Sequence, residues 1–211
     1  MIPVKVLAVQ YLSAVTPELS KALGTEAPCL GLITTDSDDP TYIALDQATK
    51  DAQVTVAYGR SFYAGAANAS TPYAGEVVGI LAGATPGAVR SGMESALSEL
   101  QRVGFEEISG VPCLAYTVSR CGSFLAKEAG VAEGTPLAYL IAPPLESMFA
   151  MDAALKAADV KLCKLYTPPT ETNFGGGLLT GTQSACMAAC AAFRDAVAEV
   201  AGKPNKEGFH G

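Results

Sequence analysis

An internal repeat constrains the fold of this chain more than any other feature of its sequence. Residues 42–56 match residues 148–162, and six of the eleven positions from 44 to 54 are identical at one offset of 106 residues. The identical pairs are Ala44/Ala150, Asp46/Asp152, Ala48/Ala154, Lys50/Lys156, Ala52/Ala158 and Val54/Val160. Because the offset is half of the 211 residues, the sequence predicts two tandem domains, each large enough to bury a core of its own.

The repeat begins upstream of this stretch. Leu19, Lys21 and Gly24 match Leu125, Lys127 and Gly130 at the same offset. Residues 104–110 read as a boundary, and the last residues are polar. We therefore expect a first domain over residues 1–104, a second over 105–203 and a polar tail over 204–211.

Each half has the pattern strand, helix, strand, helix, strand, strand, helix. In the first half, apolar runs predict strands at 4–12, 29–34, 54–58 and 77–82, and the repeated stretch predicts a helix that ends near Asp51. A helix that begins near Thr85 closes the first half, and a second helix closes the second half. Each carries an apolar stripe: Val89, Met93, Leu97 and Leu100 in the first, and Ala189, Phe193, Val197 and Val200 in the second. This order is typical of an α+β fold: two ferredoxin-like antiparallel sheets, each covered on one side by helices.

Composition narrows the possible partners. The net charge is −7 without a basic run, which argues against nucleic acid and anionic membranes. Apolar residues make up 49% and charged residues 17%, so we expect an oligomer that buries part of the surface. No long apolar span and no secretory pattern occur at the start, which predicts a cytoplasmic protein.

The cysteines and the acidic residues each allow more than one interpretation. The simplest interpretation of the thiols is that they are small, buried hydrophobic side chains. A redox pair and a zinc site are weaker alternatives; zinc is disfavoured because the one histidine, His210, lies in the tail. The six thiols are Cys29, Cys113, Cys121, Cys163, Cys186 and Cys190.

Asp36, Ser37 and Asp39 suit a helix start, whereas Asp38 could instead meet a cation.

Each half contains one long loop, which separates its last two strands. Residues 59–76 are rich in Gly, Ala, Ser and aromatic residues, and residues 167–177 end in three glycines. Neither carries the Lys-Ser/Thr that follows the glycines of a phosphate-binding loop. Loops of this length are usually functional or mobile, and the glycines would allow more than one conformation.

The repeated carboxylate and lysine are spaced as helical ion pairs. Asp46 precedes Lys50 by four residues, as Asp152 precedes Lys156. Such pairs contribute only about 0.2–0.5 kcal/mol, too little to explain two identical copies. A second role for the lysines is therefore open.

The D-x-x-x-K-x-A-x-V pattern, followed by a strand, a loop, a second strand ending in Gly and an Ala-rich helix, resembles the bacterial microcompartment shell domain. Two copies, each preceded by the strand and helix that a plain shell domain carries at its far end, resemble the permuted tandem form. The motifs SDDPTYIA, YGRSFYAGAA, AGEVV, AYLIAPPLE, MDAALKAADV, ETNF and LTGTQSAC are similar to those of the ethanolamine-utilisation shell proteins.

The resemblance implies a structural protein and not an enzyme. It implies a homotrimer whose six domains imitate a hexagonal tile, joined edge to edge to other microcompartment shell proteins. It places Lys50 and Lys156, with Asp46 and Asp152, at the tile edge. No cofactor or metal is required, although cobalamin binding or passage through a gated central pore is implied as a possibility of the family.

The resemblance also implies two kinds of pore. Ethanolamine would bind in a small acidic pore at Asp38 and Glu76, beside Phe105. The central pore loops would comprise Arg60, Ser61, Phe62, Tyr63, Thr172, Asn173, Phe174, Gly175, Gly176 and Gly177. Two other functions stay open: an enzyme that uses Asp38, Asp39 and Glu76 as paired carboxylates, and a trimeric small-molecule sensor with the same fold that does not tile.

Overall fold

The repeat appears in the structure as two sheets with one strand order. The computed structural model describes residues 1–62, 73 and 75–205. The first half forms β1 (Val6–Leu12), α1 (Pro17–Ala22), β2 (Cys29–Thr35), α2 (Asp38–Asp51), β3 (Val54–Ser61), β4 (Val77–Gly83) and α4 (Pro86–Glu99). The second half forms β5 (Glu106–Ile108), β6 (Val111–Val118), α5 (Ser123–Ala129), β7 (Leu137–Ala142), α6 (Pro144–Ala157), β8 (Val160–Tyr166), β9 (Gly175–Gly181) and α7 (Gln183–Gly202).

All strand pairs of the described residues are antiparallel. The strand orders are β1-β2-β4-β3 and β5-β6-β7-β9-β8, so the second sheet repeats the first and adds β5 at one edge. The predicted α+β fold with antiparallel sheets is thus confirmed. The tandem repeat is a structural repeat as well as a sequence repeat.

The chain divides into two compact units. The N-terminal unit comprises Pro3–Gly104 and Cys121–Glu128, and the C-terminal unit comprises Met1–Ile2, Phe105–Arg120 and Ala129–Gly211. Most of α5, although it follows a strand of the second sheet, therefore belongs to the N-terminal unit. The repeated segment around Leu125 thus belongs to the N-terminal unit, although the strands that flank it in sequence belong to the C-terminal unit.

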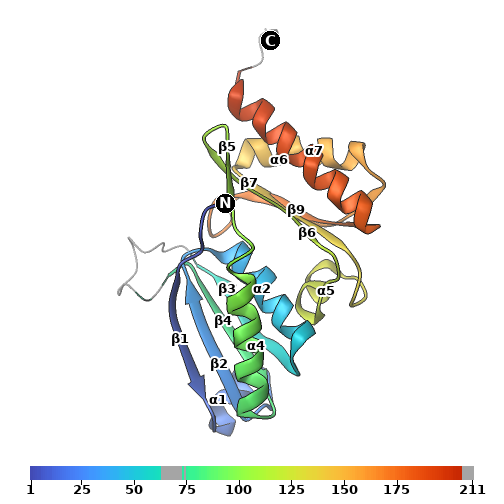
Figure 1. Ribbon diagram of the computed structural model, residues 1–211. Helices are drawn as coiled ribbons and strands as arrows, with labels where there is room; N and C mark the ends of the chain where they lie inside the picture. Colours follow the sequence, from blue (N-terminus) through green and yellow to red (C-terminus); the bar gives the residue numbers. More distant parts are fainter. Residues whose placement is uncertain (63–72, 74, 206–211) are drawn as a thin grey trace. The chain divides into compact units, whose positions relative to one another are not determined.

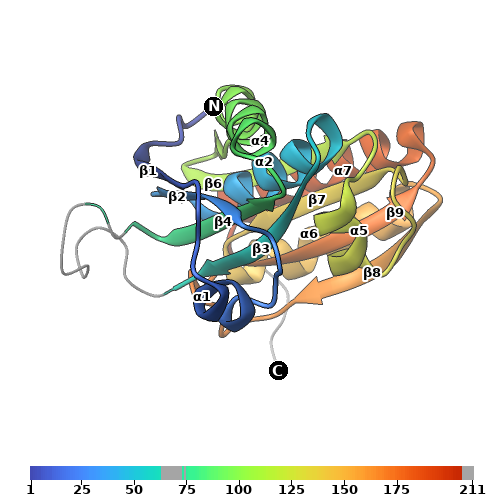
Figure 2. The ribbon, with the colours of Figure 1, turned by 90° about the horizontal axis from the view of Figure 1, so that it is seen from below.

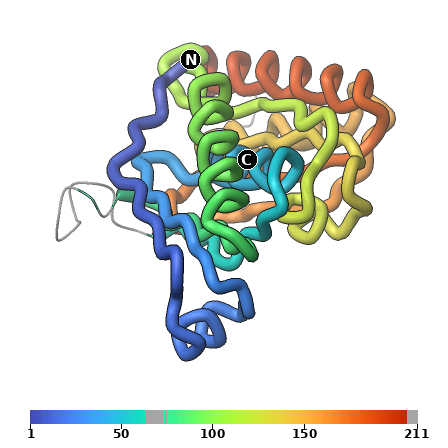
Figure 3. The backbone as a smooth tube through the Cα atoms, turned by 60° about the horizontal axis from the view of Figure 1, so that its bottom comes forward, coloured from blue at the N-terminus to red at the C-terminus, as the bar shows by residue number. Residues whose placement is uncertain are grey.

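In the N-terminal unit, α2 and α4 lie side by side over one face of the sheet (Figure 1). Ala44 and Ala48 of α2 are fully buried, and their small side chains let the helix approach the sheet closely. Val89 and Met93 of α4 complete the core, which confirms the predicted apolar stripe. In the tube view, α4 runs alongside β1 and β2 (Figure 3).

In the C-terminal unit, α6 and α7 cover one face of the second sheet (Figure 2). Phe193 of α7 is fully buried in a core that also contains Leu140 and Leu179 from the sheet. The side chain of Thr182 accepts a hydrogen bond from the backbone N–H of Ala185, and Thr85 caps α4 in the same way through Ala88.

Several boundaries differ from the sequence prediction. α2 begins at Asp38 and not near Tyr42, because acidic side chains suit the first turn and Pro40 needs no N–H donor there. β5 lies in residues 104–110, where the sequence predicts a domain boundary and no strand, and it pairs with β6 through a two-residue turn at Ser109 and Gly110. Both turn residues have positive φ, as a tight hairpin requires.

Among the described residues, no helix combines the length and the apolar character needed to span a membrane.

Candidate functional site

An acidic cluster lies where β2 ends and β4 begins. The backbone N–H of Glu76 donates to the carbonyl of Thr35 at 2.8 Å, which fixes Glu76 beside the last residue of β2. Gly75 makes this approach possible, since its φ is +64° and a Cβ there would collide with the Thr35 carbonyl. Phe62 then donates its N–H to the carbonyl of Glu76 at 3.0 Å. Glu76 therefore sits at the common end of three strands.

The other two carboxylates follow β2 directly. Asp36 is held by a hydrogen bond from the backbone N–H of Lys5 to its carboxylate, at 2.8 Å. Asp38 opens α2 and is only 7% exposed, and it accepts from the N–H of Asp39 at 2.9 Å. Burial raises the pKa of Glu76, and the negative charges of Asp38 and Asp36 raise it further. The structure thus brings Asp38 and Glu76 together, and it adds Asp36.

Helix capping does not explain these acidic residues fully. Ser37 occupies the N-cap position of α2, but its side chain makes no capping hydrogen bond. Its carbonyl instead accepts from the hydroxyls of Thr35 and Thr41, at 2.9 and 2.7 Å. The predicted helix start at Asp36, Ser37 and Asp39 is correct in position, because Ser37 is the N-cap and Asp39 lies in the first turn. The predicted capping by a side chain of Ser37 does not occur.

Phe105, the third predicted residue of the ethanolamine site, belongs to the C-terminal unit. Its ring packs edge-on against Phe174, with the centroids 5.8 Å apart. Its carbonyl accepts from the N–H of Ile2 at 2.6 Å. The aromatic contact joins a predicted pore-site residue to a predicted loop residue, which sequence spacing could not reveal.

The first predicted pore segment is partly a strand. Arg60 and Ser61 are the last residues of β3 and pair with Val78 and Val77, so the strand continues past its predicted end at Tyr58. A bulge lies between Val56 and Tyr58. The hydroxyl of Tyr42 is hydrogen-bonded to Ser61, while burial raises its pKa. Phe62 follows the strand, and Tyr63 lies outside the described residues.

The second predicted pore segment requires a correction. Gly175, Gly176 and Gly177 are not loop residues that would permit two conformations, because all three are buried in β9. Gly175 pairs with β7, and Gly176 and Gly177 pair with both β7 and β8. A side chain on Gly176, whose φ is +145°, would collide with the Leu140 carbonyl, and one on Gly177 would collide with the Lys164 carbonyl. These glycines serve close strand packing.

The residues just before β9 do form a turn. Asn173 has a positive φ of 61°, and its N–H donates to the Thr170 carbonyl at 3.1 Å. The hydroxyl of Thr170 donates to the Phe174 carbonyl at 2.7 Å. Thr172, Asn173 and Phe174 are therefore the part of the predicted segment that lies outside the sheet.

The repeated Asp–Lys pairs have opposite environments, which corrects the placement of Asp46. Its side chain is fully buried and accepts the backbone N–H groups of Gly122 and Leu125 at 2.7 and 2.8 Å. A buried carboxylate cannot contact a neighbouring tile. Burial raises its pKa, opposed by these two hydrogen bonds and by Lys50. The ion pair with Lys50, at 3.6 Å, is internal to the N-terminal unit.

The second pair lies on the surface. The side chains of Asp152 and Lys156 are 64% and 75% exposed, and their ion pair measures 2.5 Å. Lys156 is therefore available to a neighbouring molecule, and Lys50, 23% exposed, is less so.

The cysteines are free thiols, and five of the six are buried. Burial raises the pKa of Cys113 to about 12 and raises those of Cys186 and Cys190, so these thiols stay protonated and unreactive. Among the described residues, no group of three or more potential ligands is placed to hold a metal ion. His210 lies outside those residues.

The fold and the repeat define the class of protein. The BMC domain family matches residues 29–111, and the second sheet repeats the same strand order, so the chain carries two shell-type domains. A shell protein named PduB has the same fold, with a TM-score of 0.78 at 18% identity over 94% of this chain and 90% of its own.

The sequence relatives are more specific. A bacterial microcompartment shell protein EutL from Clostridium perfringens is 58% identical over 94% of both chains. Crystal structures of EutL from Leptotrichia buccalis and Clostridium perfringens are 52% and 56% identical in sequence to this chain, each with a TM-score of 0.94. The matches cover 97% and 99% of this chain and 97% and 96% of theirs. The chain belongs to the EutL family of bacterial microcompartment shell proteins. This is a family of structural proteins, not enzymes.

Proposed function

We propose that three copies of this chain form a pseudohexagonal tile of the ethanolamine-utilisation microcompartment shell. Family membership across 94% of the chain is the observation that carries this proposal. Two similar sheets per chain support it, because three copies then supply six similar domains. Neighbouring tiles would meet through Lys156, the exposed lysine of the repeat, and through Lys50.

The finer part of the proposal is that the tile has two kinds of pore. Phe62, Thr172, Asn173 and Phe174 would contribute to a gated central pore, since they lie outside the sheets. We assign no gating movement to the glycines of β9, because an added Cβ on any of the three would collide with neighbouring atoms. Cobalamin passage through that pore is an expectation of the resemblance alone.

The second pore would bind ethanolamine at Asp38 and Glu76. A primary ammonium group has three hydrogen-bond donors and is matched by carboxylates that repel one another in its absence. Burial raises the pKa of Glu76 most, and the negative charges of Asp38 and Asp36 raise it further, which supports repulsion among these carboxylates. Phe105 belongs to the C-terminal unit, and its place in this pore is an expectation of the resemblance alone.

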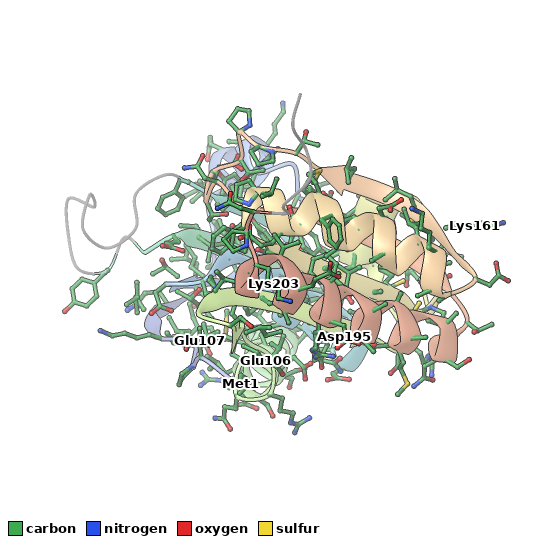
Figure 4. All side chains as sticks on the ribbon, turned by 90° about the horizontal axis from the view of Figure 1, so that it is seen from above. Met1, Glu106, Glu107, Lys161, Asp195 and Lys203 are labelled. Carbon is green, nitrogen blue, oxygen red and sulfur yellow. The ribbon has the colours of Figure 1, made fainter. Side chains whose placement is uncertain are left out.

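Titration calorimetry with ethanolamine tests the acidic site. Glu76→Gln should weaken binding at least about tenfold, because a hydrogen bond to a charged group contributes roughly 1.5–3 kcal/mol. Glu107→Gln is the matched control, since Glu107 is an exposed residue of β5 (Figure 4). Equal affinity in both variants would refute the site and leave the assignment to the shell family intact.

A further inference from the structure

The two carboxylates of the proposed ethanolamine site belong to different elements of the N-terminal unit. Asp38 is the first residue of α2, whereas Glu76 directly precedes β4. The chain joins Asp38 to the strands only through residues 36 and 37, so the direction of its side chain depends on how α2 is held. A ligand that both carboxylates bind depends on this arrangement, because binding groups must be held within about 0.5 Å of their productive geometry.

Glu76 is fixed to the ends of the strands through its backbone. Its N–H donates to the Thr35 carbonyl at 2.8 Å, and its carbonyl accepts from the N–H of Phe62 at 3.0 Å. Ser61, the residue before Phe62, pairs with Val77, the residue after Glu76. A group that holds Ser61 in place therefore also holds Glu76.

Tyr42 of α2 contacts Ser61 from the helix. Its hydroxyl is hydrogen-bonded to both the side chain and the backbone of Ser61. Its ring lies against Phe124, with the centroids 5.9 Å apart, and would lie 3.6 Å from a Cβ added to Gly59 of β3. The hydroxyl thus joins α2 to the end of β3, and the ring contacts keep the side chain directed there.

The Tyr42 hydroxyl is also close to the start of α2. Asp38 precedes Tyr42 by four residues, which places the two side chains on the same face of the helix, about one turn apart. Burial raises the pKa of Tyr42 most, and the charges of Asp38 and Asp39 raise it further, so both carboxylates lie near the hydroxyl. The contact between Tyr42 and Ser61 therefore fixes the helical turn that carries Asp38.

A different contact secures the helix start, and it forms in both halves of the chain. The Thr41 hydroxyl donates to the Ser37 carbonyl at 2.7 Å, and the Ser147 hydroxyl donates to the Pro144 carbonyl at 2.9 Å. Thr41 and Ser147 correspond at the offset of 106 residues. Because α6 begins with this contact and without a tyrosine, the helix start does not require the Tyr42 hydroxyl.

The tyrosine and the two carboxylates occur in the same half only. At the offset of 106 residues, Met148 replaces the tyrosine and Pro144, the first residue of α6, replaces Asp38. Phe174, which directly precedes β9, takes the place of Glu76. The half that lacks the carboxylates thus also lacks the hydroxyl, as expected if the hydroxyl serves the acidic site.

We propose that Tyr42 is a positioning residue of the ethanolamine site. Its hydroxyl holds Ser61 and, through the ends of the strands, Glu76. The separation of Glu76 from Asp38 is thereby fixed before the ligand arrives. Tyr42 acts through the two carboxylates and does not need to touch the ligand. The inference rests on the proposed binding of ethanolamine and adds the residue that keeps that site assembled.

Titration calorimetry with ethanolamine on Tyr42→Phe tests the proposal, because this change removes the hydroxyl and keeps the ring. We expect binding to weaken about three- to tenfold, as the loss of one intramolecular hydrogen bond implies. Ser61→Ala removes the partner hydroxyl and should weaken binding in the same direction, which keeps the test decisive if the first variant folds poorly. Tyr58→Phe makes the same chemical change at an exposed residue of β3 and should bind as the unaltered protein does.

The ionisation of Glu76 separates positioning from a general loss of stability. Neighbouring carboxylates contribute to the raised pKa of Glu76, after burial. If Tyr42→Phe lets Asp38 move away, the pKa of Glu76, followed by NMR of its side chain without ligand, should fall toward that of an ordinary glutamate. General destabilisation would lower the melting temperature and leave this pKa unchanged.

Weaker binding by Tyr42→Phe together with a lower pKa of Glu76 is the result expected here. Unchanged affinity, or weaker binding with an unchanged pKa of Glu76, would overturn the positioning role. The acidic site itself would then still stand if Glu76→Gln weakens binding. An unaltered protein that does not bind ethanolamine would overturn both the site and the inference.

Discussion

At the residue scale, Asp46 shows how one repeated side chain can acquire a structural role in a single copy. It is fully buried, and two backbone N–H groups and Lys50 surround it. Replacing both partners of a buried ion pair by apolar side chains can leave the free energy of unfolding almost unchanged. Removing only one partner lowers it strongly, because the remaining polar groups stay buried without a partner.

Removing this carboxylate should destabilise the protein clearly. Asp46→Ala leaves the N–H groups of Gly122 and Leu125 without their acceptor, so we expect the free energy of unfolding to fall by about 3 kcal/mol. Urea denaturation at fixed protein concentration measures the change. Asp195→Ala, at an exposed position of α7 (Figure 4), should change it by less than about 0.5 kcal/mol. Equal effects of the two substitutions would mean that the buried contact has no special role.

Glu76 is a residue whose charge opposes folding. Its pKa is raised by burial and by two neighbouring carboxylates, so the folded state binds its proton more tightly than the unfolded state does. Its contribution to stability is thus present below the ordinary pKa of glutamate and is lost as the pH rises through the higher folded pKa.

Glu76→Gln should therefore raise the melting temperature at pH 7 without ligand. The difference from the unaltered protein should shrink as the pH falls and vanish below about pH 4, where the glutamate is protonated in both states. Thermal unfolding from pH 4 to pH 7 measures it. The same concentration of ethanolamine should stabilise the unaltered protein more than the variant. A variant that is less stable at pH 7 would contradict the cluster of repelling charges.

At the element scale, β9 shows why three consecutive glycines can be a strand. Gly176 has a φ of +145° and lies against the Leu140 carbonyl, with no room for a Cβ. The sequence alone suggested a loop, because glycine runs are usually read as flexible segments. Only the pairing with β7 and β8 reveals the packing reason.

A substitution at Gly176 distinguishes packing from hinge flexibility. Gly176→Ala combines backbone strain with a collision, so we expect a loss of at least about 3 kcal/mol in the free energy of unfolding. Gly202→Ala serves as the control, since no atom lies within 4 Å of its added Cβ and alanine favours the helix end. A Gly176→Ala protein of normal stability would restore the hinge interpretation.

The elements with strong periodicity were predictable from the sequence. Residues 29–34 and 77–82 form the expected strands β2 and β4, and Thr85 caps α4 as predicted. The misses have physical reasons. The hairpin of β5 depends on Ser109 adopting positive φ, and the destination of α5 depends on a contact with α2 that lies far away in sequence.

The candidate site was predictable only in part. The acidic residues Asp38 and Glu76 are brought together because β2 and β4 are neighbours in the sheet. The addition of Asp36 could have been found from its position directly after β2. The different burial of Asp46 and Asp152 could not, since the two stretches around them are nearly identical in pattern.

At the scale of the whole molecule, the exposed lysine of the repeat should control assembly. Lys156→Glu reverses a charge at a side chain that is 75% exposed, so folding should be unaffected. We expect trimers of normal mass and the loss of extended sheets, observed by electron microscopy. Lys203→Glu, at the end of α7 (Figure 4), makes the same charge change elsewhere and should leave the sheets intact.

Electron microscopy of the concentrated, unaltered protein tests the central claim most directly. A tile of the microcompartment shell should form flat sheets with hexagonal packing as its concentration rises. A trimeric sensor with the same fold would remain as separate particles under the same conditions. Hexagonal sheets are the result predicted here, and dispersed trimers at every concentration and salt condition would contradict the assignment of this chain as a shell tile.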